Sequence, residues 1–274
     1  MRDLTMQVQW PLSVIWYWQT DRIKLVQRLT CAYLFDPCLC PPSLVCLTIG
    51  DVFNKPLVML PTSVTRLTIG HAFNDNIVLP PNLVSLKIGN EFNQQLFQLP
   101  ATLRHLTLGD EFNQFIGVLP SGLESLCVGH YFNQPLGVLP DTLVQLTVGH
   151  YFDQPLGILP TGLARLTCGY FFNRPLGELP DSLTHLELGF YFSQQLGPLP
   201  AALTHLHLNF AYQWPLGTIP VGIQELLLST TYNYTGTVVP ANLSRLVLRE
   251  RLSGGRYLDR WCAETEKQYQ FTKF

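Results

Sequence analysis

From Leu44 to Leu248 the chain repeats one motif with a period of twenty residues. A single copy reads L-x-x-L-x-[ILV]-G-x-x-F-N-x-P-L-G-x-L-P-x-x, and eleven copies follow one another, with one residue missing between Phe73 and Phe92. Self-similarity at a short fixed period is the signature of a solenoid, in which each coil packs only on its neighbours. A solenoid offers an extended surface without an obvious pocket, so its default role is to bind a partner.

Three apolar positions recur in each copy, at its first, fourth and sixth residues. The last two are separated by the side-chain period of a strand, so L-x-[ILV] predicts a short strand with its apolar side facing the core. The glycine that follows, as at Gly109, lets the backbone turn where a Cβ would clash. Each copy closes with Leu-Pro, and proline suits a corner because it donates no amide hydrogen.

A phenylalanine and an asparagine follow the glycine in most copies, as in Phe132-Asn133. We expect the phenylalanines to stack as a spine in the core, continued by Tyr212 and Tyr232. We expect the asparagines, Asn133 among them, to be buried and to bond neighbouring backbone, where identical amides can also stack as a ladder.

These motifs resemble known repeats. L-x-x-L-x-[ILV]-G resembles the leucine-rich repeat, and Phe132-Asn133-Gln134-Pro135-Leu136 is similar to the FNIP repeat, over roughly residues 26–249. FNIP-repeat proteins are known mainly from amoebae and from the large DNA viruses that infect them, and most have no assigned activity. Several carry an F-box ahead of the repeats, which implies a substrate receptor in ubiquitin ligation. Residues 1–25 are too few for that module.

The expected fold is a right-handed, β-rich solenoid of the leucine-rich-repeat kind, with a parallel sheet, short non-helical returns and capped ends. The return of each coil is too short for an α-helix, so extended or 3₁₀ segments are expected. We expect an N-terminal cap over 1–25, the solenoid over 26–249, and a C-terminal cap or tail over 250–274.

The two ends carry their own aromatic residues. At the amino end we expect the tryptophans at 10, 16 and 18 to cover the first coil. At the carboxyl end, Tyr257, Leu258 and Trp261 predict either a short helix over the last coil or a frayed tail.

Composition excludes several classes of function. The formal net charge is -2 and no basic stripe is present, so neither nucleic acid nor a membrane is an expected partner. The apolar segment at 10–18 is too short to span a bilayer and fits a signal peptide poorly. The charged fraction is only 13%, which leaves a rather apolar surface.

Four of the seven cysteines lie close together: Cys31, Cys38, Cys40 and Cys46. Their spacing lacks the paired C-x2-C of zinc modules and no histidine lies nearby, so we expect Cys31 to fill the core instead. Scattered thiols favour an intracellular, cytoplasmic location, or the virion if the chain is viral. A disulfide from Cys38 or Cys40 to a neighbour is the alternative.

The sequence contains no carboxylate pair, Ser-His-Asp set or glycine-rich phosphate loop, so we expect no catalytic residue and no cofactor. His185, His205 and His207 occupy outward strand positions and could meet across adjacent strands to bind a metal ion. Histidine is also an ordinary surface residue of a strand. We favour that interpretation and assign no metal site.

Aromatic residues gather just after the glycine in five adjacent copies, where earlier copies carry polar or small residues such as Asp51, Ala72 and Asn90. Aromatic side chains with few charges are typical of protein interfaces, although a ladder that packs coil on coil would give the same pattern. The candidate partner-binding residues are Tyr131, Tyr151, Tyr170, Phe171, Phe190 and Tyr191.

We therefore predict a non-enzymatic scaffold that binds a protein partner, or its own copies, through the surface of the sheet. One alternative, taken from the resemblance, is a substrate-recognition subunit in ubiquitin ligation. The other is a structural or assembly protein of a large DNA virus.

Overall fold

The computed structural model of the chain describes residues 3–6, 27–31, 40–96, 98–232, 240, 243–251 and 257–262. The chain divides into two compact units, residues 1–143 (unit 1) and 144–274 (unit 2), and each unit is described by itself. The described residues form strands, turns and bends, and none of them is helical.

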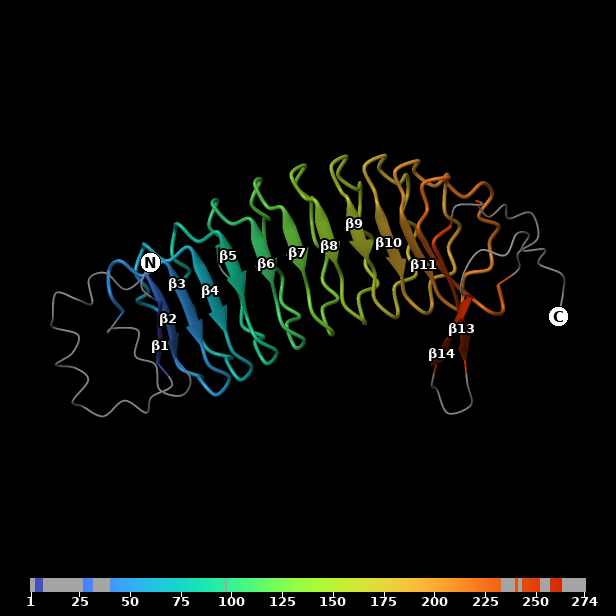
Figure 1. The fold of residues 1–274 in the computed structure, drawn as a ribbon. Coiled ribbons are helices and arrows are strands. Elements are labelled where there is room, and N and C mark those ends of the chain that lie inside the picture. Colours follow the sequence, from blue (N-terminus) through green and yellow to red (C-terminus); the bar gives the residue numbers. More distant parts are fainter. Residues whose placement is uncertain are drawn as a thin grey trace. The chain divides into compact units, whose positions relative to one another are not determined.

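Unit 1 is a β-solenoid whose strands lie side by side in chain order and run parallel (Figure 1). Equivalent repeat positions pair across the sheet, so that Leu67 lies beside Leu86 and Leu86 beside Leu106. The strands are β1 (Asp3–Met6), β2 (Arg28–Cys31), β3 (Cys46–Ile49), β4 (Arg66–Ile69), β5 (Ser85–Lys87), β6 (His105–Thr107) and β7 (Ser125–Cys127).

Unit 2 has the same construction, with six parallel strands followed by a last strand of opposite direction (Figure 1). Leu186 lies beside both Leu166 and Leu206, again at equivalent repeat positions. The strands are β8 (Gln145–Thr147), β9 (Arg165–Thr167), β10 (His185–Leu188), β11 (His205–Leu208), β12 (Glu225–Ser229), β13 (Arg245–Arg251) and β14 (Tyr257–Cys262).

The expectation of a short helix around Trp261 was wrong. Tyr257–Cys262 form β14, which pairs antiparallel with β13. A strand in this position satisfies the backbone amides and carbonyls along the edge of β13, which a helix would leave open. At the amino end, the described Asp3–Met6 pair parallel with β2, while Trp10, Trp16 and Trp18 lie outside the described residues.

The three apolar columns form the core in both units, as the motif predicts. In unit 1, Leu103, Leu106 and Leu108 are almost completely buried, and so are Leu163, Leu166 and Cys168 in unit 2. The phenylalanines stack as the expected spine, with ring centroids 5.9 Å apart between Phe92 and Phe112 in unit 1. In unit 2 the spine ends in tyrosines, with centroids 6.2 Å apart between Tyr212 and Tyr232.

The close approach of successive coils requires the glycine that follows the strand in the coils from Gly70 to Gly189, whereas Asn209, Ser229 and Arg249 replace it in the last coils. A Cβ at Gly109 would overlap the carbonyl oxygen of Gly89, and one at Gly189 would overlap that of Gly169. In the coils that carry this glycine no side chain fits at the contact, which explains the glycine more directly than backbone freedom does. Positive φ occurs instead at the second glycine of the repeat, as at Gly117 with 84°.

A turn follows the Leu-Pro corner at the end of the non-helical return segment. After the Leu-Pro corner, the amide of Leu103 donates to the carbonyl of Pro100 at 3.0 Å, and Leu183 donates to Pro180 at the same distance in unit 2. Proline fits the first position of this turn because its carbonyl accepts a bond while its nitrogen needs no partner.

The asparagine column is not buried, contrary to the sequence prediction. Asn74 is exposed and Asn113 is half-buried, because the turn that carries them lies at the coil edge. Their predicted bonding to backbone is confirmed: Asn113 Oδ1 accepts the amide of Asn133 at 2.9 Å. The ladder therefore runs from the side-chain oxygen of one asparagine to the backbone N–H of the next, rather than between asparagine side chains.

Candidate functional site

The aromatic residues that follow the glycine form one cluster in unit 2, and we call this cluster the aromatic edge. A backbone ladder supports it: the amide of Phe171 donates to the carbonyl of His150 at 2.8 Å, and the amide of Tyr191 donates to that of Tyr170 at 3.0 Å. The aromatic edge comprises Tyr151, Tyr170, Phe171, Phe190 and Tyr191.

Three of these rings make an outer row that faces solvent. The ring centroids of Tyr151 and Phe171 are 4.9 Å apart, and those of Phe171 and Tyr191 are 5.3 Å apart, with nearly parallel planes. The three residues remain 43%, 39% and 46% exposed, respectively. A row of large rings that is held by stacking and left open to solvent is suited to contact another molecule.

The other two rings make an inner row beneath the first. Tyr170 stacks on Phe190 at 4.9 Å, and Phe190 continues to Phe210 at 5.3 Å. Phe190 is only 8% exposed and meets Tyr191 edge to face at 5.0 Å. Of the candidate residues in unit 2, Phe190 therefore supports the outer row from below instead of presenting its own surface.

Tyr131 holds the same repeat position in unit 1. It is 44% exposed, and its ring lies 5.2 Å from that of His130 with the planes tilted by 56°. Its exposure matches that of the outer-row residues of unit 2.

The equivalent edge is largely polar in the coils of unit 1 that precede Tyr131. The amide of His71 donates to Asp51 Oδ1 at 3.2 Å, and the imidazole of His71 lies 3.3 Å from a carboxylate oxygen of Glu91. Asn90 Nδ2 donates to Asp110 Oδ2 at 2.8 Å. The backbone ladder is unchanged, since the amide of Glu91 donates to the carbonyl of His71 at 3.0 Å. The same backbone arrangement therefore accommodates either polar or aromatic side chains at this edge.

The outward face of the unit 2 sheet carries the three histidines that the sequence singles out. The structure brings two of them together: the rings of His185 and His205 stack with centroids 4.1 Å apart. Burial lowers the pKa of His185, and the nearby charges of His205, Arg165 and His207 lower it further.

His207 does not join this pair. Its Nε2 lies 3.0 Å from Glu225 Oε1, and the other oxygen of Glu225 accepts a bond from Arg245 at 2.9 Å. Among the described residues, no group of three or more His, Cys, Asp or Glu side chains is arranged to surround a metal ion.

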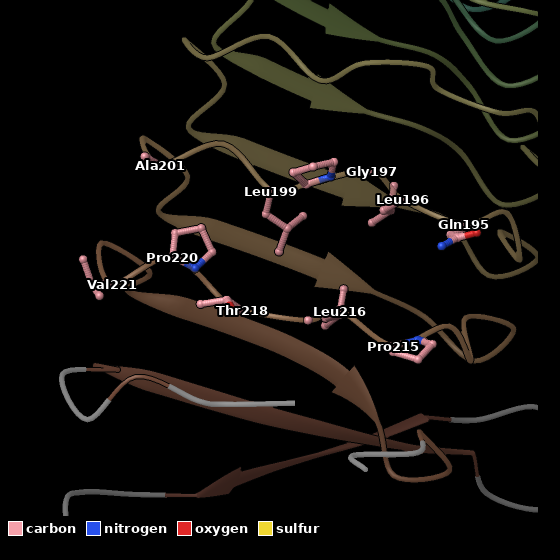
Figure 2. A pocket seen from close by; sticks show the side chains of 12 residues that line it. Gln195, Leu196, Gly197, Leu199, Ala201, Pro215, Leu216, Thr218, Pro220 and Val221 are labelled. Carbon is pink, nitrogen blue, oxygen red and sulfur yellow. The ribbon is translucent and has the colours of Figure 1, made fainter. Parts of the chain in front are cut away.

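Hollows lie on the return side of the described coils in both units. In unit 2 a hollow of about 650 Å³ lies between two successive return segments, where Leu199, Leu216 and Pro220 flank it (Figure 2). In unit 1 a hollow of about 530 Å³ is lined by residues such as Ile77, Leu96 and Pro100, at the coil that is one residue short. Neither lining includes a titratable side chain, so neither hollow offers an acid or a base for catalysis.

The described cysteines behave as apolar or half-buried side chains. Cys31 fills the core as predicted, and burial raises the pKa of its thiol to about 11. Burial also raises the pKa of Cys168, which lies in the same core column of unit 2, and that of Cys127. A thiol with a raised pKa is a poor nucleophile and a poor metal ligand. Cys38 lies outside the described residues.

The fold and its repeats define a β-solenoid of the leucine-rich-repeat type. The structure is similar to that of CroV588, a giant-virus protein described as a circular leucine-rich-repeat protein. The two are 35% identical with a TM-score of 0.72, over 88% of this chain and 38% of that one. YopM from Yersinia enterocolitica WA-314 shares the fold, with 24% identity and a TM-score of 0.62 over 81% of this chain and 49% of its own.

Within that class, the chain carries FNIP repeats. The FNIP Repeat family model matches residues 73–110, 97–131, 112–151 and 172–211, which confirms the resemblance seen in the motif. No curated protein matches the sequence. The chain spans less than half the length of either similar structure. In the part of the chain that the structure describes, no helix has the length and apolarity needed to cross a membrane.

Proposed function

We propose that this chain is a non-enzymatic scaffold that binds a protein partner through the aromatic edge of unit 2. For unit 1, taken by itself, we propose Tyr131 as a partner-binding residue because it holds the same repeat position. Leucine-rich-repeat-like folds are typical protein-interaction modules, which supports the general class. The main support for placing the binding site at the aromatic edge is that the equivalent edge is largely polar in the early coils of unit 1. The same backbone ladder there holds Asp51 and Glu91, so the fold does not require aromatic residues at this position.

The chemistry of the outer row suits a protein interface. Tyrosine is enriched among the residues that dominate binding energy, because it combines a large apolar ring with a hydroxyl. Stacking already restricts Tyr151, Phe171 and Tyr191 to one arrangement, so a partner that docks on them orders few side chains. We propose the cytoplasm, or the virion for a viral chain, as the setting, and the buried thiols of Cys31 and Cys168 suit a reducing compartment.

Self-assembly is the second candidate function, and a different surface favours it. On the return side of unit 1, Val118 and Val138 are 92% and 91% exposed, and Phe115 is 56% exposed. Aliphatic side chains so fully open to water mark a surface that gains from being covered. A structural or assembly role would use this surface, whereas a substrate receptor would use the aromatic edge.

Affinity capture with the full chain distinguishes these roles. We expect the double variant Tyr151→Ser, Phe171→Ser to lose the proteins that wild type retains. The matched control, Val52→Ser with Glu91→Ser, changes the same repeat position in two coils of unit 1, and this variant should retain those proteins. Cullin-pathway subunits among the proteins lost would identify a ubiquitin-ligase receptor. Capsid proteins or further copies of this chain that both double variants retain would instead identify assembly through the return side. Equal capture by both double variants would contradict the proposed site.

A further inference from the structure

Two histidines of unit 2 are held in matching positions on adjacent strands. His185 on β10 and His205 on β11 are partners in the parallel register, and both are half-buried on the outward face of the sheet. Their imidazole rings stack with centroids 4.1 Å apart and planes within 8° of parallel. No such pair exists around His105 of unit 1, whose partners in the register are Ser85 and Ser125.

Two threonines orient the rings in the same way. Thr184 Oγ1 donates its hydrogen to the carbonyl of Ala164 at 2.9 Å, and it lies 2.8 Å from His185 Nδ1. Thr204 makes the same two contacts, to the carbonyl of Thr184 and to His205 Nδ1, both at 2.9 Å. Because each hydroxyl hydrogen is already used, the hydroxyl accepts from the ring, so Nδ1 carries a proton in both histidines.

The two Nε2 atoms are left for a ligand, since no described residue bonds to either of them. The rings are parallel and equivalent threonines hold their Nδ1 atoms, so both Nε2 atoms point in the same direction within their ring planes. An Nε2 atom that takes up a proton becomes an N–H donor. Two such donors side by side match one carboxylate, whose two oxygens can each accept one bond. These oxygens lie closer together than the rings, so each bond bends slightly, as hydrogen bonds tolerate.

We propose that His185 and His205 bind one carboxylate of an acidic segment of the partner, together with protons that their Nε2 atoms take up. The site rests on the proposed function and names the chemistry of its partner, because His185 precedes Phe190 and Tyr191 of the aromatic edge on the same coil. Two stacked imidazolium rings repel each other, so the pair alone resists full protonation. A carboxylate placed across both rings offsets this repulsion.

A positive charge beside the pair also favours an anion. Arg165 on β9 is the register partner of His185, is exposed, and forms no ion pair with the described residues. Burial, and then the positive charges of its neighbours, Arg165 among them, hold the pKa of His185 below its usual range. A bound carboxylate stabilises the charged rings and therefore raises this pKa. The affinity should rise as the pH falls through the pKa of the bound state, and it should level off below that of the free state.

The two glutamates of this face do not occupy the pair. Glu225 on β12 is the register partner of His205, but its two carboxylate oxygens lie against His207 and Arg245. Glu187 faces outward on β10 and is exposed, so water and salt screen its repulsion of a second carboxylate. Both rings therefore remain open to a carboxylate from outside the chain.

Calorimetry of the full chain with a short polyglutamate peptide, at about pH 5.5 and about pH 7.5, tests the site. We expect binding at least about tenfold tighter at the lower pH, with a heat that depends on the buffer because protons are taken up. His185→Gln and His205→Gln should abolish this pH dependence, whereas the matched control His105→Gln should keep it. Equal affinity at both pH values, or an equal loss in His105→Gln, would overturn the proposal.

A variant of the aromatic edge separates this site from the proposed function. Tyr151→Ser with Phe171→Ser leaves both histidines in place, so it should bind polyglutamate as tightly as wild type does. If that variant also captured proteins as wild type does, only the aromatic edge would be refuted. If it lost those proteins while His205→Gln captured them equally at both pH values, the carboxylate site would be refuted instead.

A further variant tests Thr204 as a positioning residue. Thr204→Val preserves the shape of the side chain but removes the acceptor for His205 Nδ1. We expect several-fold weaker polyglutamate binding at about pH 5.5, and nitrogen chemical shifts of His205 that report a mixture of tautomers at about pH 7.5. Wild-type shifts that already place the proton of neutral His205 on Nε2 would contradict the uptake of a proton at that atom.

Discussion

The edge that follows the strands differs between the two units, although its backbone does not. In unit 1 the amide of Glu111 donates to the carbonyl of Asn90 at 2.8 Å, and in unit 2 the amide of Phe171 donates to that of His150 at the same distance. Around this common ladder, the coils of unit 1 that precede Tyr131 carry carboxylates, amides and an imidazole, whereas unit 2 carries two rows of rings.

The buried columns show the opposite behaviour. The phenylalanine spine has nearly the same spacing in both units, 5.9 Å between Phe92 and Phe112 and 6.1 Å between Phe172 and Phe192. Packing against the neighbouring coil restricts these positions to one kind of side chain. The edge faces solvent, so its composition is free to follow function. Four sets of variants test this contrast.

The largest effect is expected in the spine, where the two units are alike. Phe112→Ala in unit 1 and Phe172→Ala in unit 2 each remove a fully buried ring and leave a cavity. Each should lower the free energy of unfolding by about 3–5 kcal/mol. Denaturant titration measures both. A large loss in one unit and a negligible loss in the other would show that the spine is not a shared requirement.

A smaller loss is expected from the asparagine ladder, which is polar but structural in both units. Asn113→Leu leaves the amide of Asn133 without its acceptor, which should cost about 1–3 kcal/mol in thermal unfolding. Asn113→Asp keeps an acceptor and should stay close to wild type, because Asp153 already accepts the amide of Asn173 at 3.0 Å. If leucine were tolerated as well as aspartate, the bond would contribute nothing.

The tyrosines that end the spine sharpen the comparison within unit 2. Tyr232 accepts the amide of Leu216 at 3.1 Å and donates to the carbonyl of Trp214 at 3.0 Å, so Tyr232→Phe should cost about 1–2 kcal/mol.

Tyr212→Phe is the matched control for this variant. Among the described residues, no group forms a hydrogen bond of normal geometry with the Tyr212 hydroxyl. Burial raises the pKa of this hydroxyl to about 12, and the nearby backbone of Leu196 offsets part of that rise. This change should alter the free energy of unfolding by less than about 0.5 kcal/mol. Equal losses in the two variants, measured by the same melting experiments, would refute the distinction.

The smallest effect on stability is expected when the edges are exchanged. Phe171→Glu places in unit 2 the residue type that unit 1 carries at Glu91, and it removes the stacking with Tyr151 and Tyr191. The loss should be about 0.5–1.5 kcal/mol. The reverse change, Glu91→Tyr, should be neutral within about 0.5 kcal/mol. A loss for Phe171→Glu as large as that for Phe172→Ala would show that the aromatic edge serves packing rather than binding.

The period predicted much of this structure because each repeated residue meets its own equivalent in the next coil. Leu106, Phe112 and Gly109 each lie in a column, so one correct interpretation of a single copy applies to all of them. The sequence predictions were wrong at positions whose structure the repeat period does not determine. Asn113 is half-buried because the depth of a turn depends on the whole coil, and Tyr257–Cys262 form a strand because β13 offers an open edge.

For this protein the sequence alone determined the solenoid, its core columns and the outward positions of its histidines and aromatic residues. Only the tertiary structure decided which outward side chains meet. It separated the buried Phe190 from the exposed Phe171, turned His207 toward Glu225, and stacked His185 on His205. The physical reason is that periodicity specifies the column and the face of a residue. The rotamer of its side chain and the side chains that it meets follow from contacts between strands.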